Sequence, residues 1–216
     1  MRSPRSIAVV AALAVSSLLL TGCFTGKRAH FSNESDAPTS AVSDPAIQAV
    51  LTQLAASNTG QYTATYTVLT KYGNATTTAS VAQMDPTTRS ITIGHVRYLV
   101  QQAGAQTCEL STGACETGLL DERVSDTQIT HDFFSSSAAL RLRQDVNTMV
   151  SAAVGSTKQI AGQTATCALV HFTAGDKTYC SLANGLLAEQ DTPDVRIDLT
   201  ALTTEADASL FTPSAP

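Results

Sequence analysis

The sequence predicts an α+β fold in which a curved antiparallel β-sheet, an unclosed half-barrel, carries helices on its concave face. Two stretches, residues 45–57 and 135–154, place apolar side chains at the helical period of 3.6. Each stretch is followed by a block of short runs with period two, separated by turn residues, which is typical of an antiparallel meander. The chain has no strand–helix–strand alternation that would indicate a parallel sheet.

The first helix is expected over residues 45–57. Ser43 or Asp44 supplies an N-cap, and Pro45 suits the first turn. Four apolar residues then recur at i, i+3, i+4 and i+7, which places them on one face of the helix: Ile47, Val50, Leu51 and Leu54.

A first meander is expected after this helix. Period-two patterns predict strands over residues 61–69, 75–84 and 90–102, and a short strand that runs into Cys108. Turn residues separate the first three strands, at Tyr72-Gly73-Asn74 and at Asp85-Pro86. Gly94, inside the third predicted strand, is interpreted as a bulge. Residues 117–134 have no regular period.

The second half repeats this order. A helix is predicted over residues 135–154, ending at Gly155, with one apolar face formed by Ala139, Leu142, Val146, Met149, Val150 and Ala153. Further strands are predicted over residues 165–172, 178–181, 186–190 and 195–202. Asn184-Gly185 indicates a hairpin turn. The apolar tail, residues 209–213, is expected to dock on the domain.

The N-terminus has the parts of a bacterial export signal and resembles a lipobox. Arg2 and Arg5 form a positive region, and residues 7–20 form an apolar stretch of signal-peptide length. The run Leu20-Thr21-Gly22-Cys23 ends on the cysteine that a lipobox acylates. We therefore expect a lipoprotein signal peptide over residues 1–22, a palmitate-type diacylglyceryl anchor on Cys23 and a flexible tether over residues 23–44. The alternative is an ordinary signal peptide with a chance cysteine.

The remaining cysteines indicate two disulfides. An even number in an exported chain is typical of disulfide pairing, although four cysteines allow three connectivities. Each sequence-local pair brackets a turn signal, so a hairpin would bring its two sulfur atoms together. We favour Cys108–Cys115 and Cys167–Cys180. A zinc site is the alternative, but neither spacing is CxxC.

Composition and motifs argue against several function classes. The net charge of −5 does not suit binding to nucleic acid or to anionic lipid surfaces. The chain lacks GxSxG, HExxH, SxxK, P-loop and GxGxxG motifs. The histidines are scattered, and His131-Asp132 and Asp121-Glu122 are interpreted as parts of solvated loops. We expect no catalytic residue, no cofactor, no metal and no nucleic-acid partner.

Several short segments give the chain a family likeness. They are the lipobox with its tether, the apolar helix face from Ile47 to Leu54, the runs at residues 160–167 and 184–187, and the ending at residues 195–200 and 209–213. With these the chain resembles actinobacterial surface lipoproteins of the LolA type, relatives of the mycobacterial lipid-carrier lipoproteins. The resemblance implies a cavity for acyl chains between helices and sheet, lined by Leu51, Leu54, Tyr66, Val68, Ile91, Ile93, Tyr98, Leu142, Val146 and Met149.

The function expected from the sequence is therefore non-catalytic binding of acyl chains of a lipid or a lipoprotein over residues 45–216. The protein would be a monomer in the cell envelope, anchored to the extracytoplasmic face of the cell membrane. Two alternatives stay open. In one, the apolar residues fill an ordinary core and the lipoprotein binds a protein partner or senses the envelope. In the other, the protein is an envelope enzyme.

Overall fold

The computed structural model of the chain describes residues 42–56 and 58–213, which belong to a compact unit spanning Ser40–Pro216. The expected signal peptide, the expected lipid anchor at Cys23 and all but the last three residues of the expected tether lie outside the described residues. None of the helices in the described ranges is both long and apolar enough to cross a membrane.

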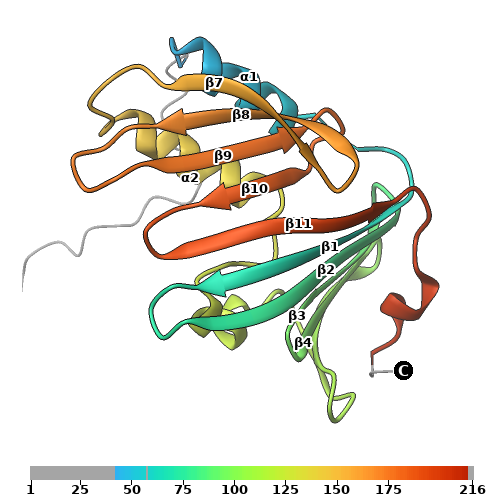
Figure 1. The fold of residues 1–216 in the computed structure, drawn as a ribbon. Helices are drawn as coiled ribbons and strands as arrows, with labels where there is room; N and C mark the ends of the chain where they lie inside the picture. The colour runs from blue at the N-terminus through green and yellow to red at the C-terminus, as the bar shows by residue number, and fades with distance from the viewer. Residues whose placement is uncertain (1–41, 57, 214–216) are drawn as a thin grey trace, which may run out of the picture. The chain divides into compact units, whose positions relative to one another are not determined.

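The described part of the unit is built on one antiparallel sheet of eleven strands (Figure 1). In chain order the strands are β1 (Tyr62–Thr70), β2 (Ala75–Asp85), β3 (Thr88–Ile93), β4 (Val96–Gln101), β5 (Gly104–Glu109), β6 (Cys115–Thr117), β7 (Val154–Ile160), β8 (Gln163–Val170), β9 (Lys177–Leu182), β10 (Leu187–Asp191) and β11 (Val195–Thr203). Their spatial order is β6-β5-β4-β3-β2-β1-β11-β10-β9-β8-β7. The predicted fold class is confirmed, because two meanders meet where β1 pairs with β11, and β6 and β7 form the open edges.

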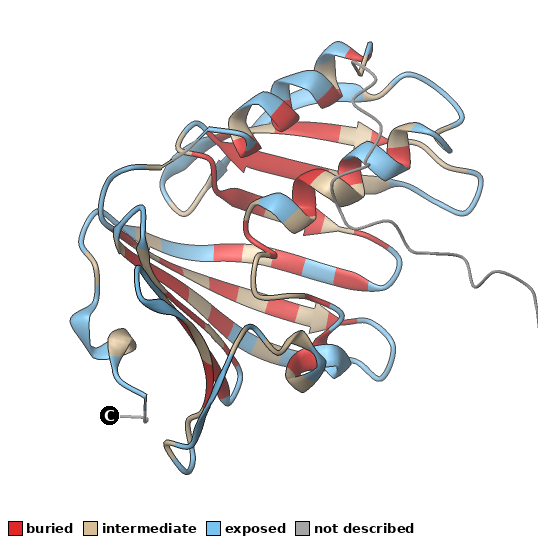
Figure 2. Cartoon of the chain, turned by 180° about the vertical axis from the view of Figure 1, so that it is seen from behind, coloured by how far each residue is buried: buried red, intermediate tan, exposed pale blue. Residues whose placement is uncertain are grey.

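Helical segments cover one face of the sheet, which we call the inner face (Figure 2). Helix α1 (Pro45–Leu54) packs on β7, β8 and β9 and contacts helix α2 (Ser136–Val146). A short 3-10 helix, η2 (Asp121–Thr127), lies beside β1. The two α-helices therefore lie over the β7–β10 half of the inner face, and the η2 segment lies over the other half.

The inner face is apolar because the strands alternate as the sequence predicts. In β1 the side chains of Tyr62, Ala64, Tyr66 and Val68 are at most 3% exposed, and the intervening residues are half-buried threonines and Leu69. These four residues belong to one hydrophobic cluster that also contains the buried apolar residues of α1 and α2. The predicted apolar stripe of the first helix is confirmed, since Ile47, Val50, Leu51 and Leu54 are all buried.

Helix α1 begins where its cap residue predicts. The carboxylate of Asp44 accepts hydrogen bonds from the backbone N–H groups of Ala46 and Ile47, at 3.0 and 3.1 Å. Its second oxygen accepts from the N–H of Ala153, at 2.8 Å, which ties the start of the helix to the start of β7. The helix ends at Leu54, three residues before the predicted end.

The outer face of β3 and β4 is covered by the C-terminal tail, as expected. The tail forms a 3-10 helix, η3 (Ala208–Phe211), against β3. The Ser90 hydroxyl donates to the carbonyl of Leu210, and the Arg97 guanidinium donates to the carbonyl of Thr212 at 2.6 Å. These bonds bury Arg97 to 2% exposure, so the tail is an integral part of the domain.

The single strand predicted over residues 90–102 is wrong. The structure has two strands, β3 and β4, which pair from Arg89–Val100 to Ile93–Val96. Gly94 is not a bulge but part of the tight turn between them, with φ +58°. The apolar alternation changes phase between Ile93 and Val96, and a two-residue turn accounts for that change.

The second helix is shorter than predicted: residues 147–153 form turns and irregular chain, and strand β7 begins at Val154. Helix α2 ends at Val146, and β7 begins at Val154, so Gly155 lies inside a strand and does not end a helix. The N–H of Val150 bonds to the carbonyl of His171, and the side chain is 59% exposed where a buried helical face was predicted. The backbone leaves the helix because it pairs with β8 instead, from Val154–Leu169 onward.

Both favoured disulfides are present. Cys108 lies directly opposite Cys115 in the β5–β6 pair, and Cys167 lies opposite Cys180 in the β8–β9 pair. The Cα atoms are 4.0 Å apart in each case. The strand register therefore brings each pair together, as the bracketed turns predict.

The first testable prediction concerns the Asp44 cap. Asp44→Ala removes the acceptor for two helix N–H groups and for Ala153, and we expect it to lower the free energy of unfolding by about 1–2 kcal/mol. Urea denaturation followed by circular dichroism measures this, with Gln48→Ala at an exposed position of the same helix as the control. A loss no larger than that of Gln48→Ala would contradict the role given to Asp44.

Candidate ligand-binding site

The ten residues expected to line a cavity all lie in or against the core on the inner face. Eight are at most 7% exposed and belong to one cluster: Leu51, Leu54, Tyr66, Val68, Ile91, Ile93, Tyr98 and Leu142. The other two, Val146 and Met149, are partly buried and pack against that cluster. Met149 follows α2 and does not belong to it. The structure brings these residues together, and their role in ligand binding stays a prediction.

Helix α1 is fixed to the sheet by apolar packing and by one polar contact group. The Gln53 amide donates to the Thr166 hydroxyl at 3.0 Å, and the Ser181 hydroxyl donates to the Gln53 carbonyl oxygen at 2.8 Å. Ser181 is completely buried and also lies 3.3 Å from the carbonyl oxygen of Val50. Four large aliphatic side chains of the helix are buried beside these contacts, so α1 is firmly held.

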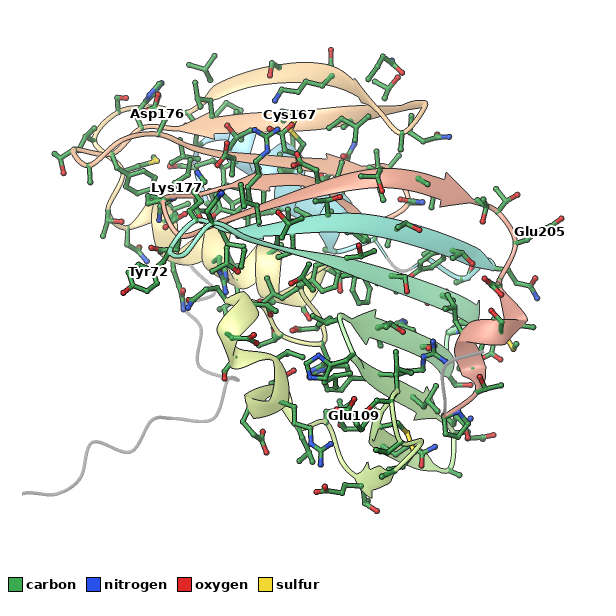
Figure 3. All side chains as sticks on the ribbon, turned by 60° about the horizontal axis from the view of Figure 1, so that its bottom comes forward. Tyr72, Glu109, Cys167, Asp176, Lys177 and Glu205 are labelled. Atoms are coloured by element: carbon green, nitrogen blue, oxygen red, sulfur yellow. A yellow bond between two sulfur atoms is a disulfide. The ribbon has the colours of Figure 1, made fainter. Side chains whose placement is uncertain are left out.

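Helix α2 makes fewer apolar contacts with the core than α1 does, and it also makes a charged contact with strand β9. Its buried residues are two alanines, Leu142 and Asp145. The Asp145 carboxylate accepts from the Tyr179 hydroxyl at 2.7 Å and from the Lys177 ammonium at 2.6 Å. Figure 3 labels Lys177 at the start of β9. Burial, and then the hydrogen bond and charge of Asp145, raise the pKa of Tyr179 well above its ordinary value. We call the contact of Asp145 with Lys177 and Tyr179 the α2 latch.

The segment that precedes α2 places two phenylalanines against the core, and the sequence analysis missed both. The ring of Phe133 meets that of Tyr66 edge to face, with centroids 5.1 Å apart, and meets that of Phe134 at 5.7 Å. The Tyr66 hydroxyl donates to the carbonyl of Leu187 at 3.1 Å. No periodic pattern in the sequence marks this segment. The contacts of Phe133 and Phe134 with the core therefore become visible only in the folded structure.

A pocket of about 280 Å³ opens where the end of α1, the start of α2 and two turns meet. It is lined by Leu54, Ala55, Ala56, Asn58, Tyr62, Gln83, Pro86, Arg89, Phe134, Ser135, Ser136, Asn184, Gly185 and Leu186. Of the ten predicted lining residues, only Leu54 is among them. Four of the pocket residues belong to the core cluster, so the pocket floor is continuous with the core: Leu54, Tyr62, Phe134 and Leu186.

Other chemistry is sparse in the described ranges. They contain no group of three or more histidine, cysteine, aspartate or glutamate side chains that would hold a metal ion. His131 bonds to Asp121 through Nδ1, at 2.8 Å, and not to its neighbour Asp132. The ring of His131 lies 5.8 Å from that of Tyr98. This contact helps to join the loop at residues 128–132 to η2 and to β4.

The chain matches no protein-family model and no curated protein. Among solved structures it is similar to MucB, with a TM-score of 0.48 and 15% identity over 75% of this chain and 60% of that one. It is also similar to a chain of the Pseudomonas aeruginosa MucA/MucB complex, with a TM-score of 0.46 and 15% identity over 76% of this chain and 58% of that one. A third similar structure is a LolA superfamily protein from Nitrosomonas europaea, with a TM-score of 0.36 and 9% identity over 74% of this chain and 94% of that one.

The coverages, identities and TM-scores describe a likeness of fold only. The chain spans only about 60% of the length of MucB. With TM-scores below 0.5 and identities of 9–15%, the similarities transfer no ligand, partner or activity to this chain.

The second prediction concerns Gly185, in the turn between β9 and β10 at the edge of the pocket. A Cβ atom there would lie 2.1 Å from the carbonyl oxygen of Ala56, and φ is +89°. Gly162 has a similar φ of +74° but open space around it. We expect Gly162→Ala to cost about 1 kcal/mol of unfolding free energy, and Gly185→Ala to cost about 2 kcal/mol more because of the clash. Equal losses in urea denaturation would show that the turn does not pack tightly against Ala56, just beyond the end of α1.

The third prediction concerns alkaline pH. Burial raises the pKa of Tyr62 to about 12 and also raises the pKa values of Tyr66, Tyr98 and Tyr179. The unfolded chain loses these protons near pH 10 while the folded chain keeps them, so the unfolded state binds fewer protons. The free energy of unfolding should therefore fall as the pH rises from about 10 to about 12.

Urea denaturation at stepped pH measures this fall, and the tyrosinate absorbance of these buried phenols should appear together with unfolding. Tyr62→Phe removes one of these four groups and should make the fall less steep. A free energy of unfolding that stays constant up to about pH 11 would contradict the burial of these phenols.

Proposed function

We propose that this chain is a lipoprotein, anchored through Cys23 to the extracytoplasmic face of the cell membrane, that holds acyl chains of a lipid or a lipoprotein under α1 and α2 without catalysis. The lipobox-like run before Cys23 supports the anchor and its location. The apolar inner face of an open sheet, covered by two short helices, supports the binding role.

The single observation that carries this proposal is the pocket between the helices. Its floor is made of Leu54, Tyr62, Phe134 and Leu186, which are themselves members of the core cluster. An acyl chain that enters the pocket therefore meets apolar side chains at once and can extend along the inner face. Each buried methylene contributes about 0.8 kcal/mol, so even a partly inserted chain is held.

The core is packed with side chains, so a longer acyl chain enters only if a helix moves. Helix α2 is the one that moves at lower cost, because only one of its buried side chains, Leu142, is a large aliphatic one, whereas α1 buries four. The α2 latch adds polar contacts that break and re-form without a permanent loss of apolar burial. We therefore assign gating to α2 and anchorage to α1.

A second candidate function is protein binding, and the open edge at β7 favours it. Six of the seven residues of β7 are exposed, and β8 is its only partner strand among the described residues. An extended peptide that pairs with such an edge gains main-chain hydrogen bonds. Partner capture that is lost when proline replaces Thr157 in β7 would favour this function over lipid binding.

The fourth prediction tests acyl-chain binding and the gate. The sample is the chain from residue 23 onward with Cys23→Ser, which has no anchor of its own and contains the whole compact unit with its core. We expect saturable binding of a fluorescent fatty acid. Tyr179→Phe removes one bond of the latch, so uptake should become about fivefold faster, as expected for the loss of about 1 kcal/mol.

The matched control is Tyr72→Phe, since Tyr72 is 93% exposed at the tip of the β1–β2 hairpin (Figure 3). Its uptake rate should equal that of the unsubstituted chain. Absence of saturable binding would remove lipid binding as the function. Binding with unchanged uptake in Tyr179→Phe would remove only the gating role of α2.

A further inference from the structure

The pocket is lined by one cationic side chain and by no anionic one. Arg89 is the only ionised residue that lines it, although the chain as a whole has 18 acidic and 13 basic residues. Arg89 lies near the start of β3, opposite Gln83, on the same face of the sheet as Ile91 and Ile93. In the described part of the chain it belongs to none of the salt bridges, so its charge has no carboxylate partner.

The guanidinium of Arg89 is held in one orientation. Its Nε and Nη2 atoms donate to Oε1 of Gln83, at 3.2 and 2.9 Å. The amide of Gln83, which is 1% exposed, donates in turn to the carbonyls of Asn58 and Gly60, at 2.6 and 3.0 Å. The guanidinium also lies over the ring of Phe134, 5.5 Å from its centroid. Arg89 is therefore positioned before any ligand arrives.

This arrangement uses two of the five N–H groups of the guanidinium. The other three belong to Nη1 and Nη2, at the end of the side chain, and a fork of that kind binds a carboxylate or a phosphate through two oxygens. No further bond of these groups to another described residue is present. The outer end of Arg89 is thus a pre-oriented donor for an oxyanion.

The remaining polar groups of the pocket are mainly donors. Oδ1 of Asn58 accepts from the N–H of Gly60, and Oδ1 of Asn184 accepts from the N–H of Leu186, which leaves both amide nitrogens as donors. Ser135 precedes α2 without a side-chain capping bond, and the first turn of that helix borders the same pocket, where the Ser136 hydroxyl donates to the Asp132 carboxylate. The Arg89 guanidinium and the amide donors of Asn58 and Asn184 therefore converge beside an apolar floor.

From this we infer that the pocket binds the anionic head group, a carboxylate or a phosphate, of an amphiphile, with Arg89 as the residue that contacts the oxyanion. The inference rests on the proposed function, because it assigns the head-group end of the same acyl-chain site. The tail lies on Leu54, Tyr62, Phe134 and Leu186, and the head group meets Arg89 at the mouth of the pocket.

The test compares decanoate with 1-decanol by isothermal titration calorimetry at neutral pH, using the chain from residue 23 with Cys23→Ser. The two probes share an apolar tail and differ in charge. A charge-assisted hydrogen bond contributes enough that decanoate should bind about tenfold more tightly or better. Arg89→Gln should abolish this preference and leave decanol binding unchanged. Arg89→Lys keeps the charge but not the fork, and should retain only part of the preference.

Arg143→Gln is the matched control, because Arg143 is an exposed arginine of α2 outside the pocket. It should keep the full preference for decanoate. Inorganic phosphate, added as a competitor, distinguishes a lipid head group from a free anion: displacement of decanoate by phosphate at similar affinity would overturn the amphiphile assignment. Circular dichroism confirms that each variant is folded.

The outcomes separate this inference from the proposed function. Equal affinities for decanoate and decanol would overturn the head-group site and leave acyl-chain binding intact. Absence of binding by both probes would overturn both proposals. A preference for decanoate that persists in Arg89→Gln would place the oxyanion elsewhere and overturn the role of Arg89.

Discussion

The structure depends on one constraint: an open sheet of eleven strands has an apolar inner face, and short segments must cover it. Helices α1 and α2 cover one half, and the residues from η2 to Phe134 cover the other. A closed barrel would need no such cover, because its strands would bury the interior themselves. Every feature relevant to binding in this domain lies in or beside these covering segments.

The two helices are attached to the sheet with different strength, and for this reason we expect α2 to move more easily than α1. Helix α1 is tied down by the Asp44 carboxylate at its start and by Gln53 near its end. Helix α2 relies on Leu142, two alanines and the latch around Asp145. In the binding mode that we propose, a ligand gains the apolar contacts that α2 gives up, and its binding energy offsets the cost of moving that helix.

The sequence predicted the parts of the fold that have a strong period. Residues 45–54 and 62–70 were recognisable because burial imposes periods of 3.6 and 2 on them. Strand β7 was missed because an exposed edge strand has no buried side to impose alternation, and the helix prediction ran into it. The two strands β3 and β4 were merged because both carry apolar alternation, and only its change of phase at Gly94 marks the turn.

The pocket was not predictable from sequence in the same way. Arg89, Gln83 and Phe134 are brought together by strand register and by an irregular segment, neither of which leaves a periodic signal.

The measurement that tests the account most directly is hydrogen–deuterium exchange with and without a saturating long-chain fatty acid such as palmitate. If an acyl chain replaces α2 on the inner face, amides of residues 136–146 should exchange faster in the complex, while those of β1 and α1 stay protected. Unchanged exchange in α2 at saturation, or uniform protection of the whole domain, would contradict a gate at this helix and favour a permanently filled core.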